Sequence, residues 1–266
     1  MDKSRYNATV IGKIMVTPDL MIFTINADEE RAEFEAGQHL LLGLYGCEER
    51  SPNSEPEFLA AEPDQLIKRP YSIASAKSET RQLEFYISQV KSGQLTSRLF
   101  NLNVGDRLFV GTKITGHFRL DETPDGSDIV MVATGTGIAP YISFLRSHLV
   151  DRPESKMVVL QGAAHRWDLG YYSELTFLEK TYANFFYVPT LTDADERWDG
   201  YRSSLEELLR NEVLQNEFNI TPNPERTHFF VSGNPAMVAH VAEWLDGFGY
   251  TRNHPDEPGE LYVEEV

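Results

Sequence analysis

Residues 128–145 read DIVMVATGTGIAPYISFL, and this stretch decides the fold of the second half of the chain. The apolar run Ile129–Ala133 predicts a buried strand, and the pattern over Pro140–Leu149 predicts a helix. Gly135 and Gly137 lie in the turn between them. Glycine lets a backbone approach a ligand closely, and a helix start offers unpaired N–H groups to an anion. The spacing is G-x-G-x-x-P rather than the dinucleotide fingerprint G-x-G-x-x-G, so the turn alone fits a structural role as well as a nucleotide site.

The same strand–helix alternation continues to the end of the chain and predicts a doubly wound parallel sheet. The last strand, His228–Ser232, also runs into a loop of small residues, Gly233–Met237. Two such loops at the carboxyl ends of parallel strands mark the crevice where these sheets bind nucleotides. Further strands are expected at Met157–Gln161 and Phe185–Leu191, and further helices at Tyr171–Tyr182, Ser204–Asn211 and Pro235–Phe248.

The first 120 residues read as β structure, with short apolar runs between turn signals. Runs at this spacing predict an antiparallel barrel or sandwich. We therefore expect a β domain over 1–120, a linker over 121–127 and an α/β domain over 128–266. The expected strands are Ala8–Val16, Leu20–Ile25, His39–Leu44, Tyr71–Ala74, Leu83–Val90 and Arg107–Gly111, with a short helix over Thr96–Leu102.

Composition excludes several classes of function. The net charge of −17 argues against general nucleic-acid binding and against anionic membrane surfaces. The single cysteine, Cys47, excludes an intramolecular disulfide and a cysteine-ligated cluster. No apolar run is long enough to span a membrane, and the N-terminus lacks the apolar core of a signal peptide. We expect a cytoplasmic protein, a monomer, with no metal site.

The β half carries its own candidate binding residues. Arg69-Pro70-Tyr71-Ser72 places a cation, an aromatic ring and a hydroxyl on one extended segment. Arginine holds a phosphate bidentately, and tyrosine stacks on a flat ring. Gly93–Thr96 opens the short helix and is a second candidate seat for a phosphate. An exposed arginine beside a half-buried tyrosine is the alternative reading of such a segment taken alone.

Together these motifs resemble the ferredoxin–NADP reductase family in its compact bacterial branch, over nearly the whole chain. The resemblance implies an antiparallel Greek-key β-barrel that binds FAD, followed by the α/β domain for a pyridine nucleotide. It implies an enzyme that exchanges two electrons with NADPH or NADH by hydride transfer, and single electrons with ferredoxin or flavodoxin. The motifs that carry it are Arg69–Ser72, Tyr86–Ser88, Gly93–Thr96, Gly135–Pro140 and Gly233–Met237.

The resemblance also implies roles for particular residues. Arg69 would bind the FAD pyrophosphate, Tyr71 would stack on the flavin ring, and Ser72 would bond near its N5 atom. The FAD site would comprise Arg69, Pro70, Tyr71, Ser72, Tyr86, Ile87, Ser88, Gln94, Leu95, Thr96, Thr136, Leu261 and Tyr262. The NAD(P) site would comprise Gly135, Thr136, Gly137, Pro140, Arg166, Thr192, Asp193, Arg202, Gly233, Asn234, Pro235 and Met237. The residues implied in catalysis are Ser72, Ser232, which stands where the family often has cysteine, and Glu264.

The chain departs from the family where the coenzyme's 2′-phosphate would be read. The family uses arginines there, and the matching positions hold Ala164, Asp193 and Tyr201. A carboxylate about 4 Å from a phosphate costs ~1 kcal/mol in water and ~4 kcal/mol at an effective dielectric of roughly 20. This predicts weak discrimination for NADPH or a preference for NADH. A shift of one residue that lets other arginines bind the phosphate stays open, and these are Arg166, Arg197 and Arg202.

Other readings of the same motifs stay open. A reductase that serves an oxygenase, a cytochrome or free flavin carries them too, and a non-catalytic redox subunit is a third candidate. Residues 69–120 hold a net charge of +5, which favours an acidic electron carrier. The acidic, proline-rich segment Cys47–Leu66 is expected to be a long surface loop that selects the partner or caps the adenine of FAD.

Overall fold

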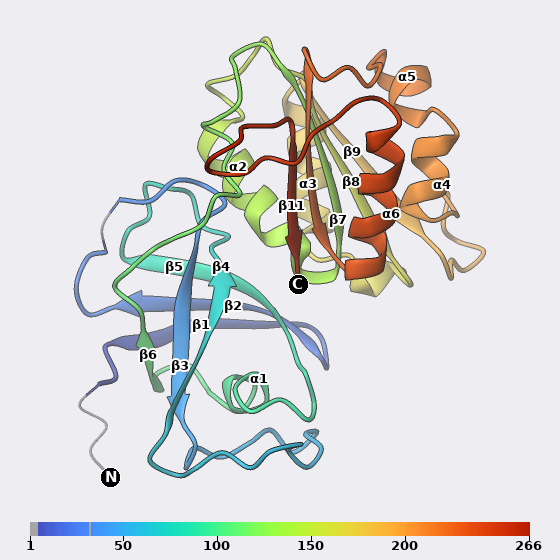
Figure 1. The fold of residues 1–266 in the computed structure, drawn as a ribbon. Coiled ribbons are helices and arrows are strands. Elements are labelled where there is room, and N and C mark those ends of the chain that lie inside the picture. Colours follow the sequence, from blue (N-terminus) through green and yellow to red (C-terminus); the bar gives the residue numbers. More distant parts are fainter. Residues whose placement is uncertain (1–4, 32) are drawn as a thin grey trace. The chain divides into compact units, whose positions relative to one another are not determined.

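The computed structural model describes residues 5–31 and 33–266, which form two compact units (Figure 1). The first unit is Met1–Gly116 and the second is His117–Val266. Residues 1–4, which belong to the N-terminal stretch tested above for a signal peptide, lie outside the described part. Among the described residues, no helix combines the length and the apolar character needed to cross a bilayer.

The division falls before the predicted linker at 121–127. Phe118 is buried and already packs on the second unit, with its ring 5.3 Å from that of Phe230 and 6.0 Å from those of Tyr141 and Phe144. Side-chain packing therefore assigns the residues around Phe118 to the α/β unit, although their sequence reads as a continuation of the β half.

The first unit is a six-stranded antiparallel sheet with the order β4-β3-β6-β1-β2-β5. Its two edges meet just after β4, where Ile73 forms a bridge with Phe85 and the Ala74 N–H donates to the Glu84 carbonyl at 2.8 Å. The sheet thereby closes into a barrel, as the sequence predicts. Its elements are β1 (Ala8–Thr17), β2 (Leu20–Ala27), β3 (His39–Tyr45), β4 (Leu66–Ser72), β5 (Gln82–Ser88), α1 (Thr96–Leu99) and β6 (Arg107–Val110).

Alternation of side chains builds the barrel core. Leu83, Phe85 and Ile87 of β5 all point into it, as expected from their spacing. The fourth strand begins at Leu66, earlier than the predicted Tyr71–Ala74. The proline in this strand hides its extent in the sequence, but β4 pairs only with β3, and an edge strand tolerates a residue without an N–H group.

The second unit is a five-stranded parallel sheet with the order β11-β10-β7-β8-β9. The chain leaves β7 toward β8 and β9 and then returns to the other side of β7 through β10. The order of the strands therefore reverses between β7 and β10, which is the switch point of a doubly wound sheet. The strands are β7 (Asp128–Thr134), β8 (Met157–Ala163), β9 (Phe185–Leu191), β10 (Thr227–Gly233) and β11 (Leu261–Glu265).

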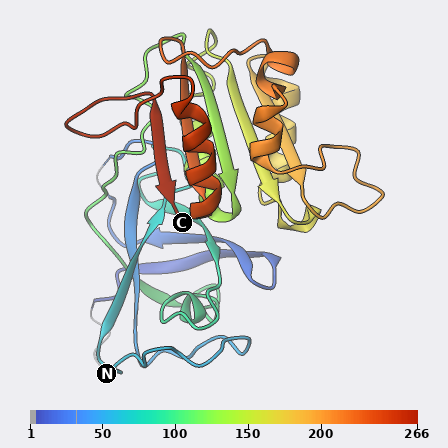
Figure 2. The same cartoon turned by 45° about the vertical axis from the view of Figure 1, so that its right-hand side comes forward.

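Helices cover both faces of this sheet. Helices α4, α5 and α6 share a core with Val130, Val132 and Phe229, whereas α2 packs on Phe230 of the opposite face (Figure 2). Two elements were not expected as such, α5 and the strand β11 in the C-terminal tail. The helices are η1 (Gly135–Ile138), α2 (Ala139–His148), η2 (Arg166–Asp168), α3 (Tyr172–Thr181), α4 (Leu205–Arg210), α5 (Val213–Phe218) and α6 (Pro235–Asp246).

Candidate functional site

The two glycine loops predicted from the sequence lie against each other at the switch point. A Cβ atom on Gly137 would lie 2.3 Å from the Ser232 carbonyl oxygen, and one on Gly233 would lie 2.3 Å from Thr134 Oγ1. Gly233 also has a φ of +137°, which side-chain-bearing residues rarely adopt. Only glycine fits at these positions, so the backbones of the two loops come close enough to form one continuous cradle.

Two side chains that the sequence analysis did not single out hold this cradle together. Thr134 Oγ1 accepts a hydrogen bond from the Asn234 N–H at 2.9 Å, which ties the end of β7 to the start of α6. The Tyr141 hydroxyl lies 3.0 Å from the Val132 carbonyl and 2.8 Å from the Phe230 carbonyl. Burial raises the pKa of Tyr141 well above its usual value, so this hydroxyl stays a donor. A tyrosine right after Pro140 is the only signal of this role in the sequence.

The remaining predicted coenzyme residues of this region occupy these loops and the helices that follow them. Asn234 caps α6, because its Oδ1 accepts from the N–H groups of Ala236 and Met237 at 2.9 and 3.4 Å. Thr136 is half-buried in η1, Pro235 is exposed at the start of α6, and Pro140 and Met237 are buried in the first turns of α2 and α6.

The proposed catalytic residues of the second unit are neighbours on two strands. Ser232 of β10 pairs with Glu264 of β11 in the parallel ladder. Ser232 is fully buried, and within the described residues its Oγ has no hydrogen-bond partner. A buried hydroxyl without a partner is costly, so it marks a place where a ligand can supply one.

The tail residues proposed to cover the flavin are buried within the second unit. Leu261 belongs to its core, and the Tyr262 ring stacks on Phe230 at 4.3 Å with an interplanar angle of 10°. Burial, with the acidic neighbours Glu122 and Asp121 adding to it, raises the pKa of Tyr262 to about 12. Packing of these two side chains fixes β11 at the edge of the sheet.

The loops after β8 and β9 lie at the same carboxyl end of the sheet as the glycine cradle. They are bonded to each other, since the N–H groups of Thr192 and Asp193 donate to the carbonyls of Ala163 and Ala164 at 3.1 and 2.9 Å. Buried Trp198 anchors the second loop, and its Nε1 donates to the Tyr201 carbonyl at 2.8 Å. The predicted residues Arg166, Thr192, Asp193 and Arg202 are all exposed on these two loops.

In the barrel unit, β4 presents the first group of predicted residues. Arg69 and Pro70 are exposed, and Arg69 NH1 donates at 2.8 Å to the carbonyl of its neighbour Lys68. Tyr71 is half-buried with its ring against the barrel core, and burial raises the pKa of its hydroxyl. Ser72 pairs with His39 on β3. The strand therefore exposes the cation of Arg69, whereas the Tyr71 ring lies partly covered against the barrel core.

The second group lies at the start of α1. Within the described residues no acceptor is found for the backbone N–H groups of Gln94 and Leu95, and no side chain caps this helix. Thr96 Oγ1 accepts from the Val90 N–H at 3.0 Å, which holds the turn before the helix. Successive unpaired amides form a concavity suited to a phosphate.

The third group, on β5, is less accessible than the sequence indicates. Ile87 belongs to the barrel core, Tyr86 is buried, and Ser88 is exposed. The side chain of Ile87 therefore faces the interior, and only its backbone is left to line a ligand.

The segment between β3 and β4 is bonded to α1 rather than free in solution (Figure 1). Buried Arg98 donates to Glu57 and to the Gly46 carbonyl at 2.7 Å, and Gln94 Nε2 donates to the Leu59 carbonyl at 2.9 Å. Desolvation is the largest single influence on the pKa of Glu57 and raises it, but the hydrogen bonds from Arg98 and the Ala61 N–H, together with the charges of Arg98 and Arg50, lower that pKa overall. Phe58, next to this ion pair, is fully exposed.

The basic side chains of residues 69–120 do not form a patch of unpaired positive charges in the structure. Five of the eight basic side chains pair with carboxylates, and all five carboxylates lie outside the stretch. The remaining ones are too few to form a strong field, so the sequence argument for an acidic carrier is weakened. The pairs are Lys77–Glu35, Lys91–Asp19, Arg98–Glu57, Arg107–Asp28 and Arg119–Asp121.

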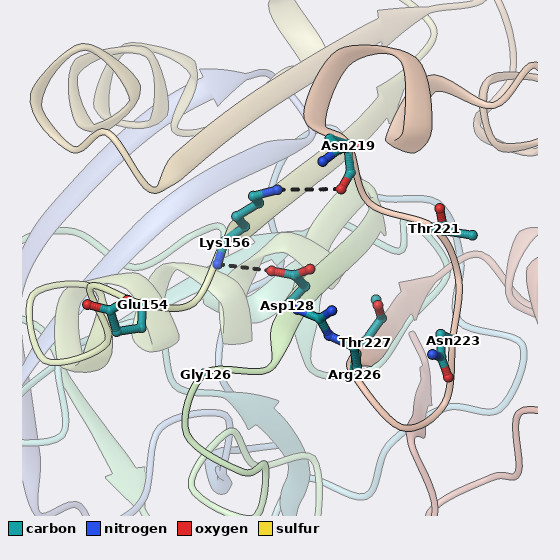
Figure 3. A pocket seen from close by; sticks show the side chains of 9 residues that line it. All are labelled: Gly126, Asp128, Glu154, Lys156, Asn219, Thr221, Asn223, Arg226 and Thr227. Carbon is teal, nitrogen blue, oxygen red and sulfur yellow. Dashed lines mark hydrogen bonds between the residues drawn. The ribbon is translucent and has the colours of Figure 1, made fainter.

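A polar pocket of about 370 Å³ lies at the opposite, amino ends of the parallel strands (Figure 3). It is lined by Asp128, Glu154, Lys156 and Arg226, among others. Lys156 Nζ already donates to the Phe218 carbonyl at 2.9 Å, and the two carboxylates balance the two cations. Ligands of doubly wound sheets bind at the carboxyl ends, so this pocket is not the coenzyme site.

Comparison with known proteins matches both units. Residues 58–119 match the family model of the oxidoreductase FAD-binding domain, and residues 131–243 match that of the oxidoreductase NAD-binding domain. A flavodoxin/ferredoxin–NADP reductase of Buchnera aphidicola subsp. Baizongia pistaciae is 31% identical over 91% of this chain and 92% of its own length. The chain belongs to the flavodoxin/ferredoxin–NADP reductase family.

Two further members of this family are similar over most of the chain. The ferredoxin–NADP reductase of Azotobacter vinelandii is 31% identical over 87% of this chain and 86% of its own length. The crystal structure of a ferredoxin NADP⁺ reductase from Neisseria gonorrhoeae with bound FAD and NADP has a TM-score of 0.82, with 26% identity and 98% coverage of both chains. The family and the fold class expected from the sequence are thereby confirmed.

Proposed function

We propose that this protein is a FAD-dependent reductase that passes electrons between NAD(P)H and ferredoxin or flavodoxin. The observation that carries the proposal is the close packing of the two glycine loops at the switch point of the parallel sheet. They occur in a chain that is 31% identical, over 91% of this chain, to a flavodoxin/ferredoxin–NADP reductase. Bound FAD supplies the redox chemistry, because it accepts two electrons as a hydride and releases them one at a time. The protein binds and orients the two nucleotides.

The barrel unit offers side chains and amides that suit FAD. Arg69 is exposed and makes one bond, to a neighbouring carbonyl, so its guanidinium is available to a pyrophosphate. The unpaired amides of Gln94 and Leu95 suit the same anion. The Tyr71 ring is the proposed stacking surface for the flavin, and burial raises the pKa of its hydroxyl, which stays protonated.

The α/β unit offers a backbone cradle that suits the nicotinamide coenzyme. Gly137 packs against the loop after β10, whereas Gly135, with a φ of +55°, has open space around its Cα. The coenzyme's phosphates would approach at Gly135, where the dipole at the start of α2 favours an anion. We assign the nicotinamide to the loop at Gly233, beside Ser232 and Glu264. The buried Ser232 hydroxyl without a partner would then hydrogen-bond this end of the coenzyme.

A visible spectrum of the purified protein tests the proposal. We expect a yellow protein whose visible flavin absorbance bleaches on anaerobic addition of NADH or NADPH. Colourless protein that FAD does not reconstitute would overturn the proposal.

The identity of the electron carrier is tested separately. Reduced protein is mixed with ferredoxin, flavodoxin, cytochrome c or free flavin, and the rate of each transfer is followed at micromolar carrier. Faster reduction of a cytochrome or of free flavin than of either carrier protein would replace the proposed partner. We further propose a cytoplasmic monomer, in line with the single, exposed cysteine, and sedimentation tests the monomeric state.

A further inference from the structure

The loops after β8 and β9 carry the charges that the coenzyme's adenosine would meet. Asp193 follows β9, and most of its side chain is exposed. Its Oδ2 lies 3.5 Å from Nδ1 of His165, which follows β8, and the same ring nitrogen lies 3.1 Å from the Asp193 carbonyl. The Asp193 N–H donates to the Ala164 carbonyl at 2.9 Å, so the loop after β8 fixes the backbone from which this carboxylate projects.

Two of the three arginines of this region, Arg166 and Arg202, already contact other parts of the fold, whereas Arg197 is exposed. Arg202 donates to the carbonyls of Ala194, Asp195 and Trp198 at 3.4, 2.9 and 2.6 Å, which closes its own loop. The Arg166 guanidinium lies over the Tyr172 ring, 5.6 Å from its centroid. A shift of one residue therefore does not free Arg202 for a phosphate, and Arg197 is the arginine on which that alternative now depends.

An aromatic face lies beside the carboxylate. Trp167 is 61% exposed, although tryptophan is usually largely buried, and its ring centroid lies 4.5 Å from that of His165. An exposed indole and an exposed carboxylate that share His165 as a neighbour offer the two contacts that an adenosine with a free 2′-hydroxyl needs. These are a stacking surface for the base and a hydrogen-bond acceptor for the sugar.

We propose that Asp193 selects a coenzyme with a free 2′-hydroxyl, so that this reductase uses NADH in preference to NADPH, with Trp167 stacking on the adenine. The inference rests on the proposed function and names its substrate. The carboxylate accepts a hydrogen bond from the 2′-hydroxyl, whereas it repels a 2′-phosphate. At a separation of about 4 Å this repulsion amounts to roughly tenfold or more in relative affinity.

Coenzyme titration of four proteins tests the inference. We expect the wild type to show a kcat/KM at least about tenfold higher for NADH than for NADPH with ferricyanide as acceptor. Asp193→Asn should narrow this ratio and Asp193→Arg should reverse it, because an arginine attracts the phosphate. The matched control is Asp195→Asn, which removes another exposed carboxylate of the same loop and should leave the ratio unchanged.

Trp167→Ala tests stacking separately from coenzyme selection. It should weaken the binding of NADH and of NADPH several-fold, without changing the ratio of their kcat/KM values. Calorimetry with ADP and with adenosine 2′,5′-bisphosphate gives the same comparison without any redox turnover. A tenfold preference of the wild type for NADPH, or a ratio that Asp193→Asn and Asp193→Arg leave unchanged, would overturn the inference. If neither coenzyme is oxidised but the calorimetric preference holds, the proposed function fails and Asp193 still selects the 2′-hydroxyl.

Discussion

The barrel unit and the parallel-sheet unit prepare their ligand seats in different ways. In the barrel, side chains on β4 would form the proposed seat together with the amides before α1, and Arg69 is exposed and bonds to the carbonyl of its neighbour Lys68. In the parallel sheet, the backbone forms the seat, and Gly137 and Gly233 are packed against neighbouring chain atoms. Substitutions in the barrel seat should therefore affect binding alone, whereas those in the sheet should affect binding and stability together.

The largest effect on stability is expected from Arg98→Gln. Arg98 lies in α1, next to the proposed barrel seat, but its contacts serve the fold and not the ligand. Arg98 is buried and pairs with the half-buried Glu57, and its removal leaves that carboxylate with Arg50 at 3.5 Å, so we expect a cost at the lower end of about 3–5 kcal/mol of unfolding free energy. Urea unfolding of the apoprotein measures this cost. Arg81→Gln is the control, because Arg81 is exposed and bonds only to the carbonyls of Ala27 and Asp28. Equal stability of the two variants would contradict the assignment of Arg98.

Gly137→Ala sharpens the comparison in the second unit. The new methyl group would lie 2.3 Å from the Ser232 carbonyl oxygen, so the two loops must move apart. We expect a loss of about 1–3 kcal/mol in unfolding free energy together with a weaker coenzyme affinity. Gly247→Ala, at the exposed end of α6, is the control for the extra methyl group. A Gly137→Ala protein with unchanged stability and coenzyme affinity would show that the cradle is not close-packed.

Arg69→Ala tests the other side of the comparison. Loss of a charged hydrogen bond to the pyrophosphate should raise the Kd of FAD by about 10- to 100-fold, which corresponds to roughly 1.5–3 kcal/mol. The unfolding free energy of the apoprotein should stay within about 0.5 kcal/mol, because the side chain is exposed. Lys68→Ala, the exposed neighbour, is the control. If Arg69→Ala unfolds more easily but binds FAD normally, the side chain serves the fold and not the ligand.

Acid should weaken the attachment of the segment between β3 and β4. The pKa of Glu57 is lowered from its usual 4.5, so its contribution to stability is present above that value and is lost as the pH falls below it through the folded-state pKa. Unfolding free energies at pH 6 and at a pH about two units lower should therefore differ more for the wild type than for Glu57→Gln. The same difference in both proteins would assign the acid sensitivity to other carboxylates.

The smallest effect on folding is expected from Ser232→Ala. Its hydroxyl is buried with no partner in the described part of the chain, so its removal should change the unfolding free energy by less than about 1 kcal/mol and in the stabilising direction. Hydride transfer from the coenzyme, followed by stopped flow, should slow several-fold. Ser155→Ala removes another buried hydroxyl of the same kind and should not change that rate. Unchanged hydride transfer in Ser232→Ala would remove this residue from the proposed site.

Local patterns in the sequence predict the two-unit architecture and the position of the glycine cradle. The strand runs of the second half, the two glycine loops and the switch from β structure to strand–helix alternation all lie where local pattern places them. Periodicity and glycine positions are local properties of the chain. They can therefore be predicted without knowledge of the tertiary contacts.

Only the tertiary structure decided which charges are free. In the sequence, Arg98 counts toward the basic stretch and Arg202 is a candidate to bind the 2′-phosphate. In the structure, Arg98 pairs with Glu57 and Arg202 donates to carbonyls of its own loop. Asp193 and Trp167 are left exposed at the ends of neighbouring strands. Because the partners of a charged side chain come from distant parts of the chain, no local pattern shows whether that charge is free to bind a ligand.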